Sequence, residues 1–224
     1  VMDGYSGRVL EGSNINDEML IASTTKIMTA IIAIENADLN SKVTISKDVL
    51  KAYGSNIYIE VGEEISLRDL LYGLLLRSGN DAAIEIARFV GGSMEEFANL
   101  MNRKAHELGM NNTNFINSSG LEDENKTGNT STAYDMALLM SYAIKNEEFV
   151  KITGTKKHIV TTNYKTYEWH NKNRLLSSYK YCIGGKTGFT KLARRTLVTA
   201  AKKDDKLLVV VTLNDGDDFN THKY

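Results

Sequence analysis

Three short patterns of reactive residue types occur in order along the chain: Ser23-Thr24-Thr25-Lys26, Ser78-Gly79-Asn80 and Lys186-Thr187-Gly188. A serine and a lysine three positions apart share one face of a helical turn, which places the amine within reach of the hydroxyl. Ser-x-x-Lys, Ser-x-Asn and Lys-Thr-Gly in this order form a known signature of enzymes with a serine nucleophile. The combination therefore predicts serine-based chemistry.

Two of the patterns occur twice, so their surroundings decide which copy is relevant. Ser23 opens a long apolar helix, whose N-terminus favours a developing oxyanion. The second copy, Ser177-Ser178-Tyr179-Lys180, has no long helix behind it. Lys186 lies in a strand-like stretch between glycines, whereas Lys126-Thr127-Gly128 lies in an acidic, polar loop. We therefore select the copies at Ser23 and Lys186.

Each selected pattern also has an ordinary structural interpretation. Ser23 alone is most simply a helix N-cap, and Lys186 alone is an exposed lysine of an edge strand. Ser78-Gly79-Asn80 alone is a pair of helix caps between two helices. These interpretations do not explain why all three patterns occur in the order and separation of the signature. That agreement favours the catalytic interpretation.

Hydrophobic periodicity predicts a helical middle flanked by strands from both ends. Helices are expected over 23–35, 66–77, 81–90, 94–108 and 132–146. Strands are expected over 1–3 and 8–11, paired as a hairpin, and over 155–162, 182–188, 196–202 and 207–213. This pattern predicts an α/β (α+β) fold with an antiparallel sheet flanked by helices plus a helical lobe. We expect a single catalytic domain, 1–224, with a sheet lobe at about 1–20 and 150–224 and a helical lobe at about 21–149.

The composition excludes several classes of protein. The chain has 224 residues, a net charge of −1, one cysteine and no proline. One cysteine excludes an internal disulfide and a cysteine zinc cluster, and the near-neutral charge argues against nucleic acid as a partner. No apolar run approaches the roughly 20 residues that cross a bilayer. Cys182 is interpreted as a buried small hydrophobic residue rather than a nucleophile.

The residues around the three patterns resemble those of the serine-type D-alanyl-D-alanine carboxypeptidases. These enzymes are low-molecular-mass penicillin-binding proteins of the β-lactamase/transpeptidase-like superfamily. The likeness covers nearly the whole chain. It is carried by Met2-Asp3 with Gly7-x-Val9-Leu10, Ala22–Ala30, Leu76–Ala82, Phe115-x-Asn117 with Gly120-Leu121, Ser131–Asp135, Asn171-x-Asn173-x-Leu175-Leu176 and Gly185–Thr190.

The resemblance implies roles for the first two patterns. Ser23 is expected to attack the carbonyl of the penultimate D-Ala of a peptidoglycan stem peptide. Lys26 must be neutral to accept the serine proton, and burial together with a nearby positive charge would lower its pKa. Ser78 and Asn80 are expected to complete the hydrogen-bond network, with Ser78 relaying a proton to the leaving D-Ala.

The third pattern is expected to bind the substrate. Lys186, also counted as catalytic, and Thr187 are expected to hold the terminal carboxylate. The backbone N–H groups of Ser23 and Phe189 form the oxyanion hole that the resemblance implies. The expected substrate-binding residues are thus Thr187, Gly188 and Phe189.

The resemblance also implies partners and location. The expected ligands are stem peptides that end in D-Ala-D-Ala, and β-lactam antibiotics that acylate the same serine. No metal or organic cofactor is expected. Because peptidoglycan lies outside the membrane, an extracytoplasmic location is expected. No signal peptide or C-terminal anchoring region of the family is recognised in the chain, so membrane association is expected only through segments that this chain lacks.

Two single positions and one tripeptide depart from the family pattern. Many members have proline where Ile21 and Glu122 stand, and neither position donates a catalytic group. Ala193-Arg194-Arg195 lies where relatives often have glycine. Arg194 or Arg195 is a candidate for approaching a substrate carboxylate.

Two other functions are compatible with the signature. A serine β-lactamase of class A uses Ser-Asp-Asn and a separate glutamate for deacylation, whereas this chain has Gly79 and no convincing glutamate motif. A catalytically inactive module that binds muropeptides or β-lactams would keep the fold, but all the reactive groups are present here. The D-alanyl-D-alanine carboxypeptidase is therefore the favoured prediction.

Overall fold

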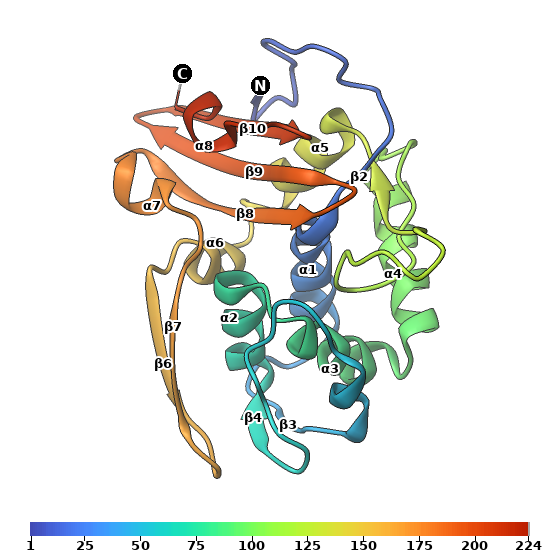
Figure 1. The fold of residues 1–224 in the computed structure, drawn as a ribbon. Coiled ribbons are helices and arrows are strands. Elements are labelled where there is room, and N and C mark those ends of the chain that lie inside the picture. Colours follow the sequence, from blue (N-terminus) through green and yellow to red (C-terminus); the bar gives the residue numbers. More distant parts are fainter. Residues whose placement is uncertain (224) are drawn as a thin grey trace.

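The computed structural model describes residues 1–223, and a four-stranded antiparallel sheet lies at one end of it (Figure 1). The strand order is β1-β10-β9-β8. The strands are β1 (Met2–Asp3), β8 (Cys182–Thr190), β9 (Arg194–Lys203) and β10 (Lys206–Leu213). β8, β9 and β10 follow one another along the chain through short turns, and this meander confirms the predicted antiparallel sheet.

The N-terminal hairpin forms and joins the sheet. β1 pairs on one side with β10, where Met2 lies opposite Val209, and on the other side a bridge joins Met2 to Val9. The N–H of Asp3 donates to the carbonyl of Arg8 at 2.8 Å, and the N–H of Leu10 donates to the carbonyl of Val1 at 2.8 Å. The segment 8–11 thus lies beside β1 as expected, although it forms a single bridge and not an extended strand. Met2 is 1% exposed, so its side chain is buried in the core.

Helices form the other half of the molecule and also cover the sheet. They are α1 (Lys26–Asn36), α2 (Leu67–Arg77), α3 (Asn80–Gly91), α4 (Met94–Glu107), α5 (Ala133–Ala143), α6 (Glu147–Thr153), α7 (Leu175–Ser178) and α8 (Asp218–Thr221). The helix α1 is buried over most of its length and packs against α2, α3, α4 and α5. It therefore forms the centre of the core, and it starts at the edge of the sheet (Figure 1).

Serine side chains cap the N-termini of two of the expected helices. The Ser66 hydroxyl accepts the N–H of Asp69 at the start of α2, and Ser93 accepts the N–H of Glu96 at the start of α4. Each bond satisfies one of the N–H groups that the first turn of a helix leaves without an intrahelical partner. Gly109, in the left-handed region at φ +75°, follows the end of α4.

Three two-stranded pairs complete the fold. They are β2 (Met19–Leu20) with β5 (Thr130–Ser131), β3 (Lys42–Thr44) with β4 (Glu64–Ser66), and β6 (Lys157–Thr161) with β7 (Thr166–His170). The β6–β7 hairpin packs on α2, on the helical side, while α5 packs on β9 and β10. Both segments thus cross the expected lobe boundaries, and the division into two lobes stays a prediction.

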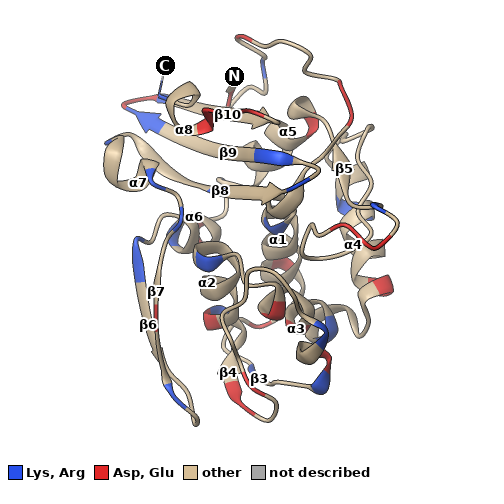
Figure 2. Cartoon of the chain, in the orientation of Figure 1, with Lys and Arg blue, Asp and Glu red and all other residues tan. Residues whose placement is uncertain are grey.

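The charges are distributed over the sheet and the helices, with Lys and Arg interspersed among Asp and Glu (Figure 2). This pattern agrees with the near-neutral net charge of −1. Within residues 1–223, no helix has the length and apolar character needed to cross a membrane.

Candidate active site

Ser23 lies in a tight turn rather than at the start of an α-helix. A 3₁₀ helix, η1 (Ala22–Thr25), precedes α1, which begins only at Lys26. Ala22 has a φ of +47°, a region that non-glycine residues rarely adopt. Such backbone strain persists only where the surroundings hold it in place. The turn therefore orients Ser23 through its neighbours, and not through the helix pattern that the sequence shows.

Two glycines make this turn possible by close approach. A Cβ at Gly120 would lie 1.8 Å from the carbonyl oxygen of Ala22, and one at Gly188 would lie 2.9 Å from the backbone nitrogen of Ser23. No larger residue fits at either position. Gly188 thereby brings β8 directly alongside the backbone of Ser23.

Lys26 is fully buried, and its amine is surrounded by oxygen atoms. Its Nζ lies 2.9 Å from Ser23 Oγ, 2.7 Å from Asn80 Oδ1 and 2.7 Å from the carbonyl oxygen of Ser119. These three contacts fix the end of a flexible side chain against the serine hydroxyl. The structure thus brings Ser23, Lys26 and Asn80 together as the sequence predicts.

The electrostatic surroundings favour the neutral amine. Burial lowers the pKa of Lys26 well below its ordinary value, and the positive charges of Lys186 and then Lys172 lower it further. Lys186 is also buried, and burial followed by the charge of Lys172 lowers its pKa to about 7. A neutral amine beside a serine hydroxyl can accept its proton.

Asn80, the first residue of α3, is oriented by the loop that precedes α2. Its side-chain nitrogen donates to the carbonyl of Tyr53 at 2.7 Å, and its backbone N–H donates to the carbonyl of Ser55 at 2.7 Å. Because the amide nitrogen is held by a carbonyl, the amide oxygen faces Lys26. The loop therefore determines which end of the Asn80 amide meets the amine.

The same loop is held by the neighbouring carboxylate. Asp81 is buried and accepts the backbone N–H groups of Ile57, Tyr58 and Ile59. Burial raises the pKa of Asp81, and the hydrogen bonds from these N–H groups oppose that shift. Asp81 thus positions the loop that orients Asn80.

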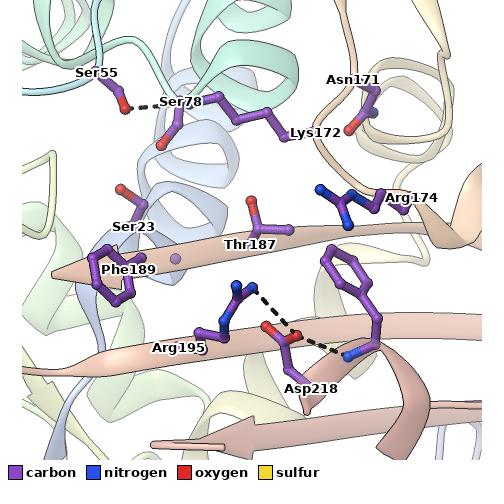
Figure 3. A pocket seen from close by; sticks show the side chains of 12 residues that line it. Ser23, Ser55, Ser78, Asn171, Lys172, Arg174, Thr187, Phe189, Arg195 and Asp218 are labelled. Atoms are coloured by element: carbon purple, nitrogen blue, oxygen red, sulfur yellow. Dashed lines mark hydrogen bonds and ion pairs between the residues drawn. The ribbon is translucent and has the colours of Figure 1, made fainter. Parts of the chain in front are cut away.

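Ser78 follows α2 in the left-handed conformation, at φ +64°, and Gly79 then leads into α3. The expected arrangement of a glycine C-cap and an Asn80 N-cap is shifted by one residue. Ser78 is 5% exposed and lies on the lining of the cleft. The break between the two helices directs its side chain towards Ser23 (Figure 3).

The Lys186-Thr187-Gly188 segment lies inside β8, and its residues face different surroundings. Thr187, Gly188 and Phe189 lie on the lining of the cleft. Lys186 is 2% exposed, and its Nζ donates to the carbonyl of Thr187 at 2.6 Å. Lys186 is therefore not the exposed edge lysine of the ordinary interpretation, and it does not belong to the residues that line the cleft.

A cleft of about 530 Å³ runs along β8 with Ser23 at one end (Figure 3). Sequence reasoning missed part of its wall: Ser55, Asn171, Lys172, Arg174, Asp218 and Phe219. Lys172 and Arg174 lie between the matched residues of Asn171-x-Asn173-x-Leu175, and their positive charge was the sequence signal that could have indicated this wall. Arg195, a sequence candidate, lines the cleft and lies 3.8 Å from Asp218, whereas Arg194 is not on the lining.

The second copies of the patterns lie outside the cleft lining. Ser177 is exposed in the short helix α7, and Lys180 lies over the ring of Tyr181. Lys126 belongs to an exposed turn, at φ +64°. Of the two copies of Ser-x-x-Lys, the one at Ser23 therefore belongs to the cleft.

The chain is similar to known proteins along nearly its whole length. A family model described as D-alanyl-D-alanine carboxypeptidase matches residues 1–217. The D-alanyl-D-alanine carboxypeptidase DacF of Bacillus subtilis is 39% identical over 212 residues, 92% of this chain and 54% of the relative. DacB2 of Mycobacterium tuberculosis is 36% identical over 213 residues, 95% of this chain and 72% of the relative. The chain thus spans about half the length of the Bacillus relative.

Solved structures agree with this assignment. A variant of a Streptomyces DD-transpeptidase superposes with a TM-score of 0.91 and 33% identity, over 99% of this chain and 93% of that chain. A D-alanyl-D-alanine carboxypeptidase of Mycobacterium tuberculosis gives a TM-score of 0.90 and 34% identity, over 95% of this chain and 80% of that chain. The likeness confirms the predicted fold class. The chain belongs to the D-alanyl-D-alanine carboxypeptidase family.

Proposed function

We propose that the chain removes the terminal D-Ala from peptidoglycan stem peptides through an acyl-enzyme on Ser23. The observation that carries this proposal is the contact of Ser23 Oγ with the buried amine of Lys26, at 2.9 Å. In the first step, Ser23 Oγ bonds to the carbonyl carbon of the penultimate D-Ala while its proton passes to neutral Lys26. The activity is extracytoplasmic in this proposal, because its substrate lies outside the membrane.

The oxyanion of the tetrahedral intermediate would be held by the N–H groups of Ser23 and Phe189. The close approach of Gly188 to the Ser23 nitrogen supports this assignment, because it places β8 next to the nucleophile turn. Fixed donors of this kind stabilise charge that develops only in the transition state.

The breakdown of the intermediate requires a proton on the departing amine. The C–N bond to the terminal D-Ala breaks, and its nitrogen takes a proton that Lys26 received and Ser78 relays. The position of Ser78 on the cleft lining supports this role. Water then attacks the acyl carbonyl and gives a proton to neutral Lys26. The bond between the acyl carbon and Ser23 Oγ breaks, and Ser23 takes that proton as the stem tetrapeptide leaves.

The terminal carboxylate would bind at the positively charged end of the cleft. Thr187 and Arg195 lie on the lining there, and Arg195 is 54% exposed in its side chain. Lys186 was expected to contact the carboxylate, but its amine is bound to the carbonyl of Thr187. In our proposal Lys186 acts on the site through its charge and through the position of Thr187.

The sharpest test is intact-mass spectrometry after incubation with benzylpenicillin. The wild-type chain should gain one intact penicillin, Ser23→Ala should gain none, and Ser177→Ala, the second Ser-x-x-Lys copy, should react normally. An unmodified wild-type chain, or an equal adduct on Ser23→Ala, would contradict the proposal. Release of D-Ala from a pentapeptide establishes the carboxypeptidase, whereas rapid penicillin turnover would favour a β-lactamase. Acylation without D-Ala release would favour a binding module.

A further inference from the structure

Glu122 contacts two segments next to the proposed active site, the end of β8 at Thr190 and the loop at Tyr53, although it donates no group to the proposed chemistry. It follows Ser119, Gly120 and Leu121, a segment that touches Lys26 and the turn of the nucleophile. Its carboxylate and its backbone carbonyl bind different partners.

The carboxylate contacts the end of β8. Thr190 Oγ1 donates to Glu122 Oε1 at 2.5 Å, and the same hydroxyl accepts the backbone N–H of Ala193. Thr190 directly follows Phe189, whose N–H is the second proposed oxyanion donor. A hydrogen bond from a neutral hydroxyl to a carboxylate is among the stronger ones in proteins. Glu122 therefore holds the strand one residue from that donor.

The backbone carbonyl of Glu122 contacts the loop at Tyr53. It accepts the hydroxyl of Tyr53 at 2.8 Å, and the carbonyl of Tyr53 in turn accepts the side-chain nitrogen of Asn80. Tyr53 thus links Glu122 to the residue that presents its oxygen to Lys26. Tyr53, Asn80, Ser119 and Glu122 also line one cavity of about 190 Å³, so these contacts lie around a common space.

We propose that Glu122 is a positioning residue. Through Thr190 and Tyr53 it fixes the end of β8, which carries the proposed oxyanion donor, relative to the loop that orients Asn80. This inference rests on the proposed function, because it concerns the same acylation of Ser23. Displacement of reacting groups by about 1 Å can lower a rate by about a hundredfold. Loss of the hydrogen bond between Glu122 and Thr190 should move the end of β8 by less than about 1 Å. We therefore expect Ser23 acylation to slow by about tenfold.

The test measures the second-order rate constant of Ser23 acylation by benzylpenicillin. Glu122→Ala and Thr190→Val should each lower it by about tenfold, and the double variant should be no slower than the slower single one. Glu122→Gln and Thr190→Ser retain the hydrogen bond and should acylate almost as the wild type does. Tyr53→Phe, which removes the other contact, should also lower the rate. Glu124→Gln, in the same loop but exposed, is the matched control.

The outcomes distinguish failure of the positioning role of Glu122 from failure of the proposed function. If the wild-type chain is not acylated, the proposed function fails. If the wild type is acylated but Thr190→Val is acylated at the wild-type rate, the positioning role is overturned and the proposed function stands. The same holds if the effects of Glu122→Ala and Thr190→Val multiply in the double variant. If Glu122→Gln is acylated as slowly as Glu122→Ala, the hydrogen bond to Thr190 is not the cause of the slower rate, and the positioning role is again overturned. A merely structural role would lower stability without this rescue pattern.

Discussion

The amine nitrogen of Lys26 lies 2.9 Å from the hydroxyl oxygen of Ser23, inside a core where Lys26 is fully buried. Ordinary Ser-x-x-Lys pairs on a helix surface leave the amine in water and charged. Here burial removes water from the amine, and the carbonyl of Ser119 and the amide oxygen of Asn80 take its place. The pair is therefore arranged for proton transfer.

Lys26→Met should lower the rate of Ser23 acylation by about a thousandfold, because a general base contributes about 10²- to 10⁴-fold. Met fills much of the same volume, so folding should persist. The matched control is Lys180→Met, since Lys180 belongs to the second copy of the pattern and lies over the ring of Tyr181. Acylation kinetics with benzylpenicillin measure both variants. Equal rates for Lys26→Met and wild type would remove Lys26 from the mechanism.

Lys172→Gln should shift the pH dependence of acylation. Burial is the main cause of the low pKa of Lys26, but the positive charges of Lys186 and Lys172 contribute. Removal of the Lys172 charge raises the pKa of Lys26, so less of it is neutral at a given pH. The acidic limb of the kcat/KM profile should therefore move to higher pH. Lys172→Arg keeps the charge, and its profile should match that of the wild type; an unmoved limb in Lys172→Gln would contradict the electrostatic role.

Arg195→Gln should weaken recognition of a substrate with a free terminal carboxylate. A hydrogen bond to a charged group contributes about 1.5 kcal/mol or more, which corresponds to a loss in kcat/KM of about tenfold. A D-Ala-D-Ala amide lacks this charge, and its hydrolysis should change little. Arg194→Gln is the control, because Arg194 is absent from the cleft lining. Equal losses for the acid and the amide would show that Arg195 acts on something other than the carboxylate.

Gly120→Ala should destabilise the fold and also displace the nucleophile. Gly109 and Gly120 both have positive φ, but a Cβ at Gly109 meets nothing within 4 Å, while one at Gly120 would lie 1.8 Å from the carbonyl oxygen of Ala22. Gly109→Ala should cost about 1 kcal/mol from backbone strain. Gly120→Ala should cost more than about 2 kcal/mol, because the turn around Ala22 must also move. Urea unfolding measures both, and equal losses would show that close approach to Ala22 is unimportant.

Much of the fold was predictable because its signals are local. The Ser66 and Ser93 caps, the apolar face of α2 and the run of β-branched residues in β10 each determine their element within a few residues. The β6–β7 hairpin shows the limit, because β7 lies outside the predicted strands and packs on the distant helix α2. The register that places Met2 opposite Val209 likewise depends on a strand some two hundred residues away, which no local pattern reports.

The site was predictable where the residues carry a motif, and not where it depends on backbone conformation or distant contacts. Ser23, Lys26 and Asn80 meet as expected. Alanine gives no sequence signal for the positive φ of Ala22, and the turn that contains it fits only because Gly120 has no side chain next to the Ala22 carbonyl. Lys186 looked like a surface residue in a strand, because burial of a lysine becomes visible only when the helices cover that face of the sheet.

Burial of two neighbouring amines, those of Lys26 and Lys186, favours the neutral forms that the proposed chemistry requires and also lowers folding stability. The pKa of Lys186 is about 7 in the folded chain against 10.5 ordinarily, so between these values the unfolded chain binds a proton that the folded chain does not. Stability therefore rises with pH across that interval, and at neutral pH the folded state bears much of the cost. A chain selected only for robustness would place apolar side chains at Lys26 and Lys186. In the proposed mechanism both amines are required, so the same burial that favours their neutral forms makes the folded chain less resistant to unfolding.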